Sequence, residues 1–141
     1  MAALKRGTVI MLRAALVSVL GVCLWVNAEA KAAAAVEYLM VPSAAMGRAI
    51  PVAFLGGGPH GVWLLDAFDA GNSVSNWVNH GNAMKTLAGK GISVVAPAAG
   101  AYSLYTDWEQ DPSKRWETFL SGELPEWLSA NKGLVVCPVF S

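Results

Sequence analysis

Short apolar runs alternate with a helical pattern through the second half of this 141-residue chain. Residues 62–65 and 92–97 are short and largely apolar, which is typical of strands buried on both faces of a sheet. A helix is predicted between them over 82–89, because Gly89 and Gly91 flank its end as helix caps do. Strands that alternate with helices form right-handed βαβ units. The sequence therefore predicts an α/β fold whose mixed sheet has a parallel centre.

An antiparallel pair of strands is predicted ahead of this alternation. Residues 38–41 and 50–55 are apolar, and the stretch 42–47 between them has turn-forming residues at both ends. We expect the pair at a sheet edge, because Pro51 cannot donate a ladder hydrogen bond and is tolerated there.

The last strong element is predicted to be a helix that Asp111 caps and Pro112 begins. Pro125 is expected to kink or break this helix, and Gly133 to end it. A final strand could follow over 134–140. The apolar residues of the helix recur at helical spacing and form one stripe. They are Trp116, Phe119, Leu120, Leu124, Trp127 and Leu128.

The first thirty-odd residues have the three-part pattern of a secretory signal peptide. A basic stretch is followed by the apolar run 14–26 and then by several A-x-A sites. The apolar run has about 13 residues, short of the roughly 20 that span a bilayer, so cleavage is favoured over a membrane anchor. We assign residues 1–33 to the signal peptide and leave the cleaved bond open.

The rest of the chain is mildly acidic, with six Lys and Arg residues against nine Asp and Glu residues. It has no basic run, so nucleic acid is not an expected partner. Cys23 would leave with the signal peptide, so Cys137 could form no internal disulfide. Cys137 is then either a small buried apolar residue or a sign that the tail around it is not original to the domain.

Few residues have the spacing that catalysis or metal binding requires. No Gly-x-Ser-x-Gly turn occurs, which gives His60 little chance of a catalytic part. His60 and His80 have no Cys or carboxylate at ligand spacing, so no metal site or cofactor is predicted. Asp66 follows the predicted strand 62–65 at its carboxyl end, where open α/β sheets bind ligands. The alternative is a loop or capping aspartate.

Aromatic residues have two interpretations. Four of them could form an exposed surface for a sugar or a protein, but packing between sheet and helices is favoured. These are Trp77, Tyr102, Tyr105 and Trp108. Three tryptophans are assigned to the core, namely Trp63, Trp116 and Trp127.

Three blocks of sequence resemble the mycobacterial antigen 85 family. They are VEYLMVPSAAMGRAIPVAFLGGGPHGVWLLDAF, LAGKGISVVAPAAGAYSLYTDWEQ and RWETFLSGELPEWLSANKG. The resemblance covers residues 36–133 and is strongest to the non-catalytic secreted paralogue of that family. The family comprises secreted mycolyltransferases, also described as fibronectin-binding proteins. The resemblance implies the N-terminal half of an α/β-hydrolase fold, with a mixed, mostly parallel sheet and flanking helices.

The resemblance implies two ligand-binding residues. The family has a Leu-Leu-Asp-Gly-Leu-Arg turn that supplies sugar-binding side chains and a backbone oxyanion donor, and residues 64–69 stand in its place. Asp66 matches the sugar-binding carboxylate, and Phe68 matches the position that donates its backbone N–H. Asp69 stands where the family has arginine. This difference reverses the charge and removes the hydrogen-bond donors of the guanidinium group.

None of the family's Ser–Glu–His triad can be assigned to this chain, so we expect no enzyme activity from it as printed. The tail 134–141 does not match the family. A shifted reading frame, an incomplete gene or a real product would each give such an ending. The predicted organisation is a signal peptide over 1–33, a partial α/β-hydrolase-like domain over 34–133 and a non-matching tail.

The expected function is that of a secreted or cell-wall-associated antigen without catalysis. By analogy with the family it would attach to fibronectin, through the segment 82–95, or bind small sugars. After cleavage of the signal peptide, no stable membrane span is expected. The alternatives are a mycolyltransferase or esterase acting on trehalose mycolates, and a truncated remnant without function.

Overall fold

The computed structural model of the chain describes residues 34–135. The predicted signal peptide, both cysteines and residues 136–140 of the predicted final strand lie outside this range. The elements, in chain order, are β1 (Val36–Ser43), β2 (Arg48–Leu55), β3 (Gly61–Trp63), α2 (Asn76–Asn79), α3 (Ala83–Leu87), β4 (Ser93–Pro97), α4 (Trp116–Thr118), the π-helical turn η1 (Phe119–Glu123) and α5 (Leu124–Lys132). No helix within residues 34–135 is both long and apolar enough to cross a bilayer.

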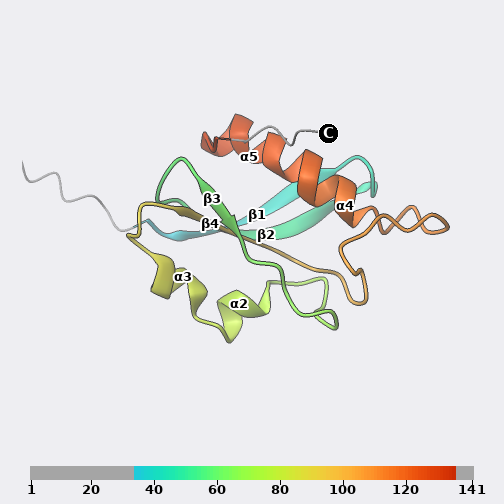
Figure 1. Cartoon of the computed structure of the whole chain (residues 1–141), viewed down its shortest axis with the longest axis horizontal. Helices are drawn as coiled ribbons and strands as arrows, with labels where there is room; N and C mark the ends of the chain where they lie inside the picture. The colour runs from blue at the N-terminus through green and yellow to red at the C-terminus, as the bar shows by residue number, and fades with distance from the viewer. Residues whose placement is uncertain (1–33, 136–141) are drawn as a thin grey trace, which may run out of the picture. The chain divides into compact units, whose positions relative to one another are not determined.

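The strands form one mixed sheet in the order β1-β2-β4-β3. The pairs β1–β2 and β2–β4 are antiparallel, and β3–β4 is parallel. The helices α4 and α5 lie on one face of this sheet, and α2 and α3 lie on the other (Figure 1). The expected α/β fold, with a mixed sheet between flanking helices, is confirmed. The expectation of a mostly parallel sheet with a parallel centre is wrong for the described residues, because the central pair β2–β4 is antiparallel and only β3–β4 is parallel.

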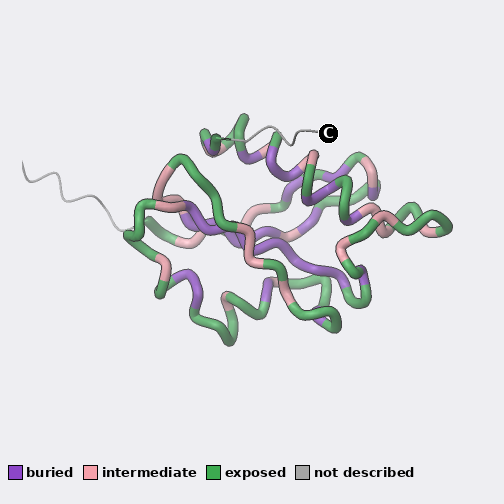
Figure 2. The backbone as a smooth tube through the Cα atoms, viewed as in Figure 1, coloured by how far each residue is buried: buried purple, intermediate pink, exposed green. Residues whose placement is uncertain are grey.

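Alternate residues of the two central strands supply two separate cores. Along β2, Val52 and Phe54 face the cluster under α4 and α5, while Ala53 and Leu55 belong to the cluster beside α3. The strand β4 divides in the same way, and all five of its residues are buried. Figure 2 shows this burial as a continuous band through the middle of the sheet. Strands covered on both faces are mostly apolar, which explains why the sequence identifies β4 so clearly.

The predicted antiparallel pair is confirmed, but Pro51 does not lie on an edge strand. Its strand β2 is flanked by β1 and β4. Pro51 is tolerated because it stands just beyond the last β2–β4 pair, Val52 with Pro97. Its carbonyl accepts a hydrogen bond from the Ala98 N–H at 2.8 Å. Because proline has no N–H, only one hydrogen bond is lost, at the end of the β2–β4 pairing.

The prediction that residues 62–65 are buried on both faces is wrong. Only Gly61–Trp63 form the strand β3, and Val62 and Leu65 are exposed. Within the described range β3 is the last strand of the sheet, paired with β4 alone. A side chain on such a strand lacks the neighbour that would cover it. The run of apolar residues does not reveal this, because the neighbour is a property of the tertiary fold.

The start of the last helix is also displaced from its predicted position. Asp111 and Pro112 form a turn, in which the Asp111 carboxylate accepts the Ser113 N–H at 3.0 Å. The helix begins at Trp116, and the residue at its N-cap position, Arg115, makes no side-chain cap hydrogen bond. A more distant residue, Asp107, caps the first turn instead. The Asp107 carboxylate accepts hydrogen bonds from the N–H of Thr118 at 3.1 Å and from its hydroxyl at 2.5 Å.

The predicted interruption at Pro125 is confirmed and takes the form of a π-helical turn. The N–H of Leu124 bonds to the carbonyl of Phe119, five residues back. Pro125 then stands at the start of α5, where a missing donor costs little. Gly133 ends α5 as predicted, with a φ of +68° that glycine adopts without strain.

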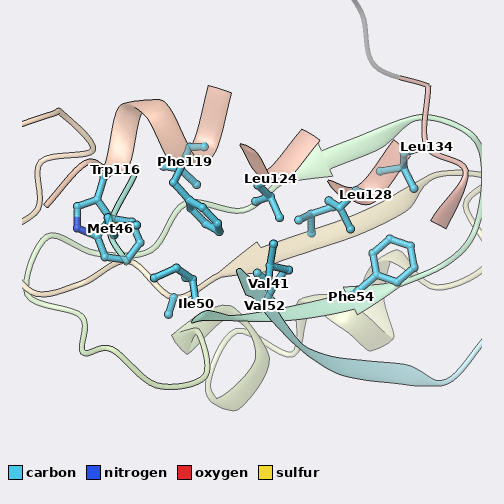
Figure 3. Packing of buried hydrophobic residues seen from close by; sticks show 13 residues of the cluster. Val41, Met46, Ile50, Val52, Phe54, Trp116, Phe119, Leu124, Leu128 and Leu134 are labelled. Atoms are coloured by element: carbon cyan, nitrogen blue, oxygen red, sulfur yellow. The ribbon is translucent and has the colours of Figure 1, made fainter. Parts of the chain in front are cut away.

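The apolar stripe packs as one surface despite the change of helical type. Its members on α4, η1 and α5 join residues of β1 and β2 in one cluster, and Figure 3 shows Trp116, Phe119, Leu124 and Leu128 in a row above the sheet. Trp127 and Trp63 pack against this cluster but are only partly buried, so of the three tryptophans assigned to the core only Trp116 is fully enclosed. Leu134, from the non-matching tail, also joins the cluster.

A carboxylate on the π turn fastens this helical layer to the β1–β2 hairpin. Glu123 accepts a hydrogen bond from the Ser43 hydroxyl at 2.5 Å and another from the Ala45 N–H at 2.8 Å. Ser43 is buried, and its hydroxyl also accepts the Met46 N–H at 3.1 Å. Glu123 thus satisfies two polar groups of the hairpin directly, and the Ser43 hydroxyl satisfies a third, the Met46 N–H.

Replacing this carboxylate should destabilise the fold. We expect Glu123→Gln to lower the free energy of unfolding by about 1–3 kcal/mol, because the amide offers one acceptor oxygen where two are used. Urea denaturation of the purified chain measures the change. The control is Glu126→Gln, an exposed residue of α5, which should change stability by less than about 0.5 kcal/mol. Equal losses in the two variants would contradict this role for Glu123.

The cap at Asp107 should make part of the stability depend on pH. The hydrogen bond from the Thr118 side chain lowers the pKa of Asp107 below its ordinary value of 3.8. A lowered pKa in the folded state adds stability above the ordinary pKa, and this stability is lost as the pH falls through the folded-state pKa. We expect Asp107→Asn to unfold at lower urea than the wild type at pH 7, with the difference shrinking below pH 3.8. A difference that stayed constant into acid would contradict this assignment.

Candidate functional site

Two loops leave the sheet side by side at the carboxyl ends of its parallel strands. The first follows β3, and the second follows β4. The parallel pairing extends one step past β3, because the Leu64 N–H bonds to the Val95 carbonyl at 2.8 Å. This edge is where ligands bind in open α/β sheets, and it carries both predicted site residues, Asp66 and Phe68.

Asp66 organises the first loop. One carboxylate oxygen accepts the N–H of Ala67 at 2.9 Å, and the other accepts the N–H of Asn76 at 2.6 Å, at the beginning of α2. Asp66 therefore serves as the loop aspartate that was one of the two sequence interpretations. It remains only half-buried, so a carboxylate oxygen with two lone pairs can still accept a hydrogen bond from a ligand.

Tyr105, from the second loop, holds the backbone of Asp66. Its hydroxyl donates to the Asp66 carbonyl at 2.5 Å. Burial is the main cause that raises the pKa of the Tyr105 hydroxyl, and the negative charge of Asp66 raises it further. The net rise keeps the tyrosine protonated, so it remains a donor throughout the neutral range.

An open depression of about 560 Å³ lies beside Asp66. Its lining is Leu65, Asp66, Ala67, Asn76, Trp77, His80 and Gly81, and we call it the Asp66 depression. The Trp77 indole N–H donates to the Leu65 carbonyl at 2.7 Å, which fixes the ring at the wall. His80 Nδ1 is 3.3 Å from the Asn76 side-chain oxygen. An aromatic ring, a carboxylate and an imidazole thus border one hollow.

Sequence reasoning did not connect Trp77 and His80 with Asp66. Both belong to a short helical segment, α2 and its C-cap, where the sequence predicted no helix. The available signal was Ser75, whose hydroxyl accepts the Trp77 N–H at 3.3 Å as the N-cap of α2. Serine followed by a helical turn marks such a cap, but a four-residue helix shows no periodicity.

Phe68 lies outside the lining of the Asp66 depression. Its side chain is 61% exposed and meets the Tyr102 ring edge-on, with the ring centroids 5.4 Å apart. The Tyr102 N–H donates to the Phe68 carbonyl at 2.7 Å, so this contact ties the two loops together. The N–H of Phe68 donates to no acceptor within residues 34–135. Asp69, beside it, is exposed.

The favoured interpretation of the four aromatic residues as packed is wrong for most of them. Tyr105 does pack against the main core. Trp77, Tyr102 and Trp108 are exposed. In the second loop, Tyr102, Leu104 and Tyr105 all have positive φ values. Such values cost energy for residues other than glycine and occur most often at functional sites.

The segment 82–95, expected by analogy to contact fibronectin, is only partly accessible. Its second part enters β4 and is buried. Lys85 and Lys90 are exposed, on α3 and in the turn after it. A protein contact through this segment would therefore be made by α3 and the following turn.

The two histidines lie at opposite ends of β3. His60 precedes the strand, while His80 borders the Asp66 depression beyond its carboxyl end. Neither ring accepts a hydrogen bond from a serine hydroxyl within the described residues. The same residues contain no group of three His, Cys, Asp or Glu side chains placed to hold a metal ion.

Comparisons with known proteins identify the family. The chain matches a family model described as "Putative esterase" over residues 43–135. It is 71% identical over 114 residues to the MPT51/MPB51 antigen of Mycobacterium tuberculosis. The aligned region covers 81% of this chain and 38% of that protein. It is 44% identical over 126 residues to a protein of Mycolicibacterium smegmatis named diacylglycerol acyltransferase/mycolyltransferase Ag85B. This aligned region covers 83% of this chain and 39% of that protein.

A solved structure agrees with these matches. The crystal structure of MPT51 from Mycobacterium tuberculosis superposes with a TM-score of 0.70 at 75% identity, over 73% of this chain and 39% of that one. The chain thus spans less than half the length of the relatives it matches. The resemblance to the antigen 85 family is confirmed. The chain belongs to the esterase family of α/β fold that this family model describes, and within it resembles the MPT51 antigen and the Ag85 mycolyltransferases.

Proposed function

We propose that this chain is a secreted recognition protein of the esterase fold, which binds a small sugar at the Asp66 depression and does not catalyse acyl transfer. The observation that carries the proposal is the meeting of Asp66, Trp77 and His80 around one open hollow. The secreted location rests on the signal-peptide pattern of residues 1–33 and on the antigen names of its relatives.

The lining of the depression suits a sugar. Carbohydrates present hydroxyl groups on their rims and C–H groups on their faces. The Asp66 carboxylate accepts from hydroxyls, and the 42%-exposed Trp77 ring offers an apolar surface for a sugar face. The hollow is wide and open, which suits a polar ligand that remains partly hydrated.

Phe68 is proposed to contribute its backbone rather than its ring. Its N–H has no acceptor among the described residues and lies on the same loop as Asp66. In this proposal part of the ligand extends beyond the depression, and the Phe68 N–H donates to an oxygen of that part. The exposed Phe68 and Tyr102 rings border that position.

Recognition is favoured over turnover because no serine or cysteine is among the described residues that line the depression. Acyl transfer of the esterase type needs a serine or cysteine hydrogen-bonded to a base. Near Asp66, Ser75 is buried and caps α2, and His80 contacts an asparagine. Acyl or mycolyl transfer, the activity in the name of the Ag85B relative, is the alternative that the experiment below separates.

Sugar binding should depend on the Asp66 carboxylate. We expect trehalose to bind the purified chain saturably by isothermal titration calorimetry, and Asp66→Asn to weaken binding roughly tenfold, the equivalent of one hydrogen bond to a charged group. Asp69→Asn is the matched control, because this exposed carboxylate does not line the depression. Equal binding by both variants would contradict the proposal.

The same preparation separates the competing functions. Hydrolysis of p-nitrophenyl butyrate by the chain, if lost on heat denaturation, would overturn the non-catalytic part. Saturable binding to immobilised fibronectin without any to trehalose would replace the sugar by a protein ligand. A chain that aggregates and shows no cooperative melting would support a remnant without function.

The hydrogen bond from Tyr105 should hold the sugar site in shape. We expect Tyr105→Phe to speed hydrogen exchange at the N–H groups of Ala67 and Asn76 and to weaken trehalose binding, because the Asp66 backbone loses its donor. The control is Tyr102→Phe, which keeps the edge contact with Phe68 and removes an exposed hydroxyl. Unchanged exchange in Tyr105→Phe would show that the bond does not order this loop.

A further inference from the structure

A second, smaller cavity lies at the other end of the same sheet edge. Its volume is about 240 Å³, below the roughly 300–1,000 Å³ of sites for drug-sized ligands. Its lining is Met40, Arg48, Ala49, Ile50, Pro51, Asn72, Ala98 and Trp116, and we call it the Arg48 pocket. It shares no lining residue with the Asp66 depression.

Most of the pocket wall is apolar and rigid. Ile50, Ala98 and Trp116 are each at most 2% exposed and belong to the main core. The Trp116 ring packs directly against Gly100 of the second loop, where an added Cβ would lie 2.3 Å from the ring. Figure 3 shows Trp116 at one end of the core, beside Met46 and above Ile50.

Arg48 brings a positive charge to this wall. Its guanidinium carbon is 5.6 Å from the centroid of the Trp116 ring, within the range of a cation–π contact. Its Nη2 makes only long contacts, at 3.5 Å to the Ser113 carbonyl and at 3.9 Å to the Met46 sulfur. Within residues 34–135 no carboxylate forms an ion pair with Arg48, whereas Lys114 and Lys132 each have one.

We propose that the Arg48 pocket binds a small organic carboxylate with a short apolar body. A guanidinium is a planar fork of donors that matches the two oxygens of a carboxylate. Arg48 has donors left for such a ligand, and Asn72 adds an amide at the wall. The apolar remainder of the ligand would pack against Ile50, Ala98 and Trp116. The small volume restricts the ligand to the size of a short-chain acid.

The test uses hexanoate as the probe and NMR of the ¹⁵N-labelled chain as the readout. We expect saturable shifts of the Trp116 indole N–H and of the Ala49 and Ala98 amides. 1-Hexanol, which has the same tail without the charge, should bind at least roughly tenfold more weakly, because it lacks a charge-assisted partner for Arg48. Equal shifts from hexanol would show a purely apolar site, and equal shifts from sodium sulfate would show a purely ionic one. Either result would overturn the proposal.

Two variants of Arg48 and one control variant test whether Arg48 binds the carboxylate. Arg48→Gln should weaken hexanoate binding roughly tenfold or more, and Arg48→Lys should weaken it less, because the charge remains and the fork is lost. The matched control is Arg115→Gln, a nearby cation that does not line the pocket, and it should bind hexanoate as the wild type does. The amide spectrum of each variant reports that it is folded. Unchanged binding in a folded Arg48→Gln variant, or hexanoate shifts confined to the Asp66 depression, would overturn the proposal.

Discussion

Covering both faces of two central strands is the constraint on which this structure depends. Alternate residues of β2 and β4 face opposite sides, so neither strand is buried unless a helical layer packs on each side. The α4–η1–α5 segment covers one face, and α2 with α3 covers the other (Figure 1). The layers leave the carboxyl ends of β3 and β4 open. The loops that carry Asp66 and Tyr105 therefore meet in solvent, with rigid strands beneath them.

The π turn lets one helical layer satisfy two requirements. Pro125 removes a donor, and the wider turn before it accommodates that loss while Phe119 and Leu124 stay on the core side. The same turn carries Glu123, which binds the hairpin between β1 and β2. π turns often occur at functional sites. Here the turn fixes the hairpin from which Arg48 reaches the Trp116 ring.

Local patterns predicted the elements whose signals lie within a few residues. The antiparallel pair, β4, the apolar stripe and the Gly133 cap follow from periodicity and turn chemistry. Features that depend on distant partners were missed. The first turn of α4 is capped by Asp107, which lies in the preceding loop and accepts the Thr118 N–H. At the site, resemblance pointed to Asp66, but its meeting with Trp77 and His80 depends on a helix too short to show a period.

We propose that the sheet presents a sugar-binding loop at its carboxyl edge, lined by described residues that include no serine or cysteine. The most direct measurement is a chemical-shift map of the ¹⁵N-labelled chain during a titration with trehalose. We expect a well-dispersed spectrum in which the shifts concentrate at residues 65–68 and 76–81 and saturate together. Shifts that concentrate elsewhere in the fold, or a spectrum that does not respond to trehalose, would contradict it.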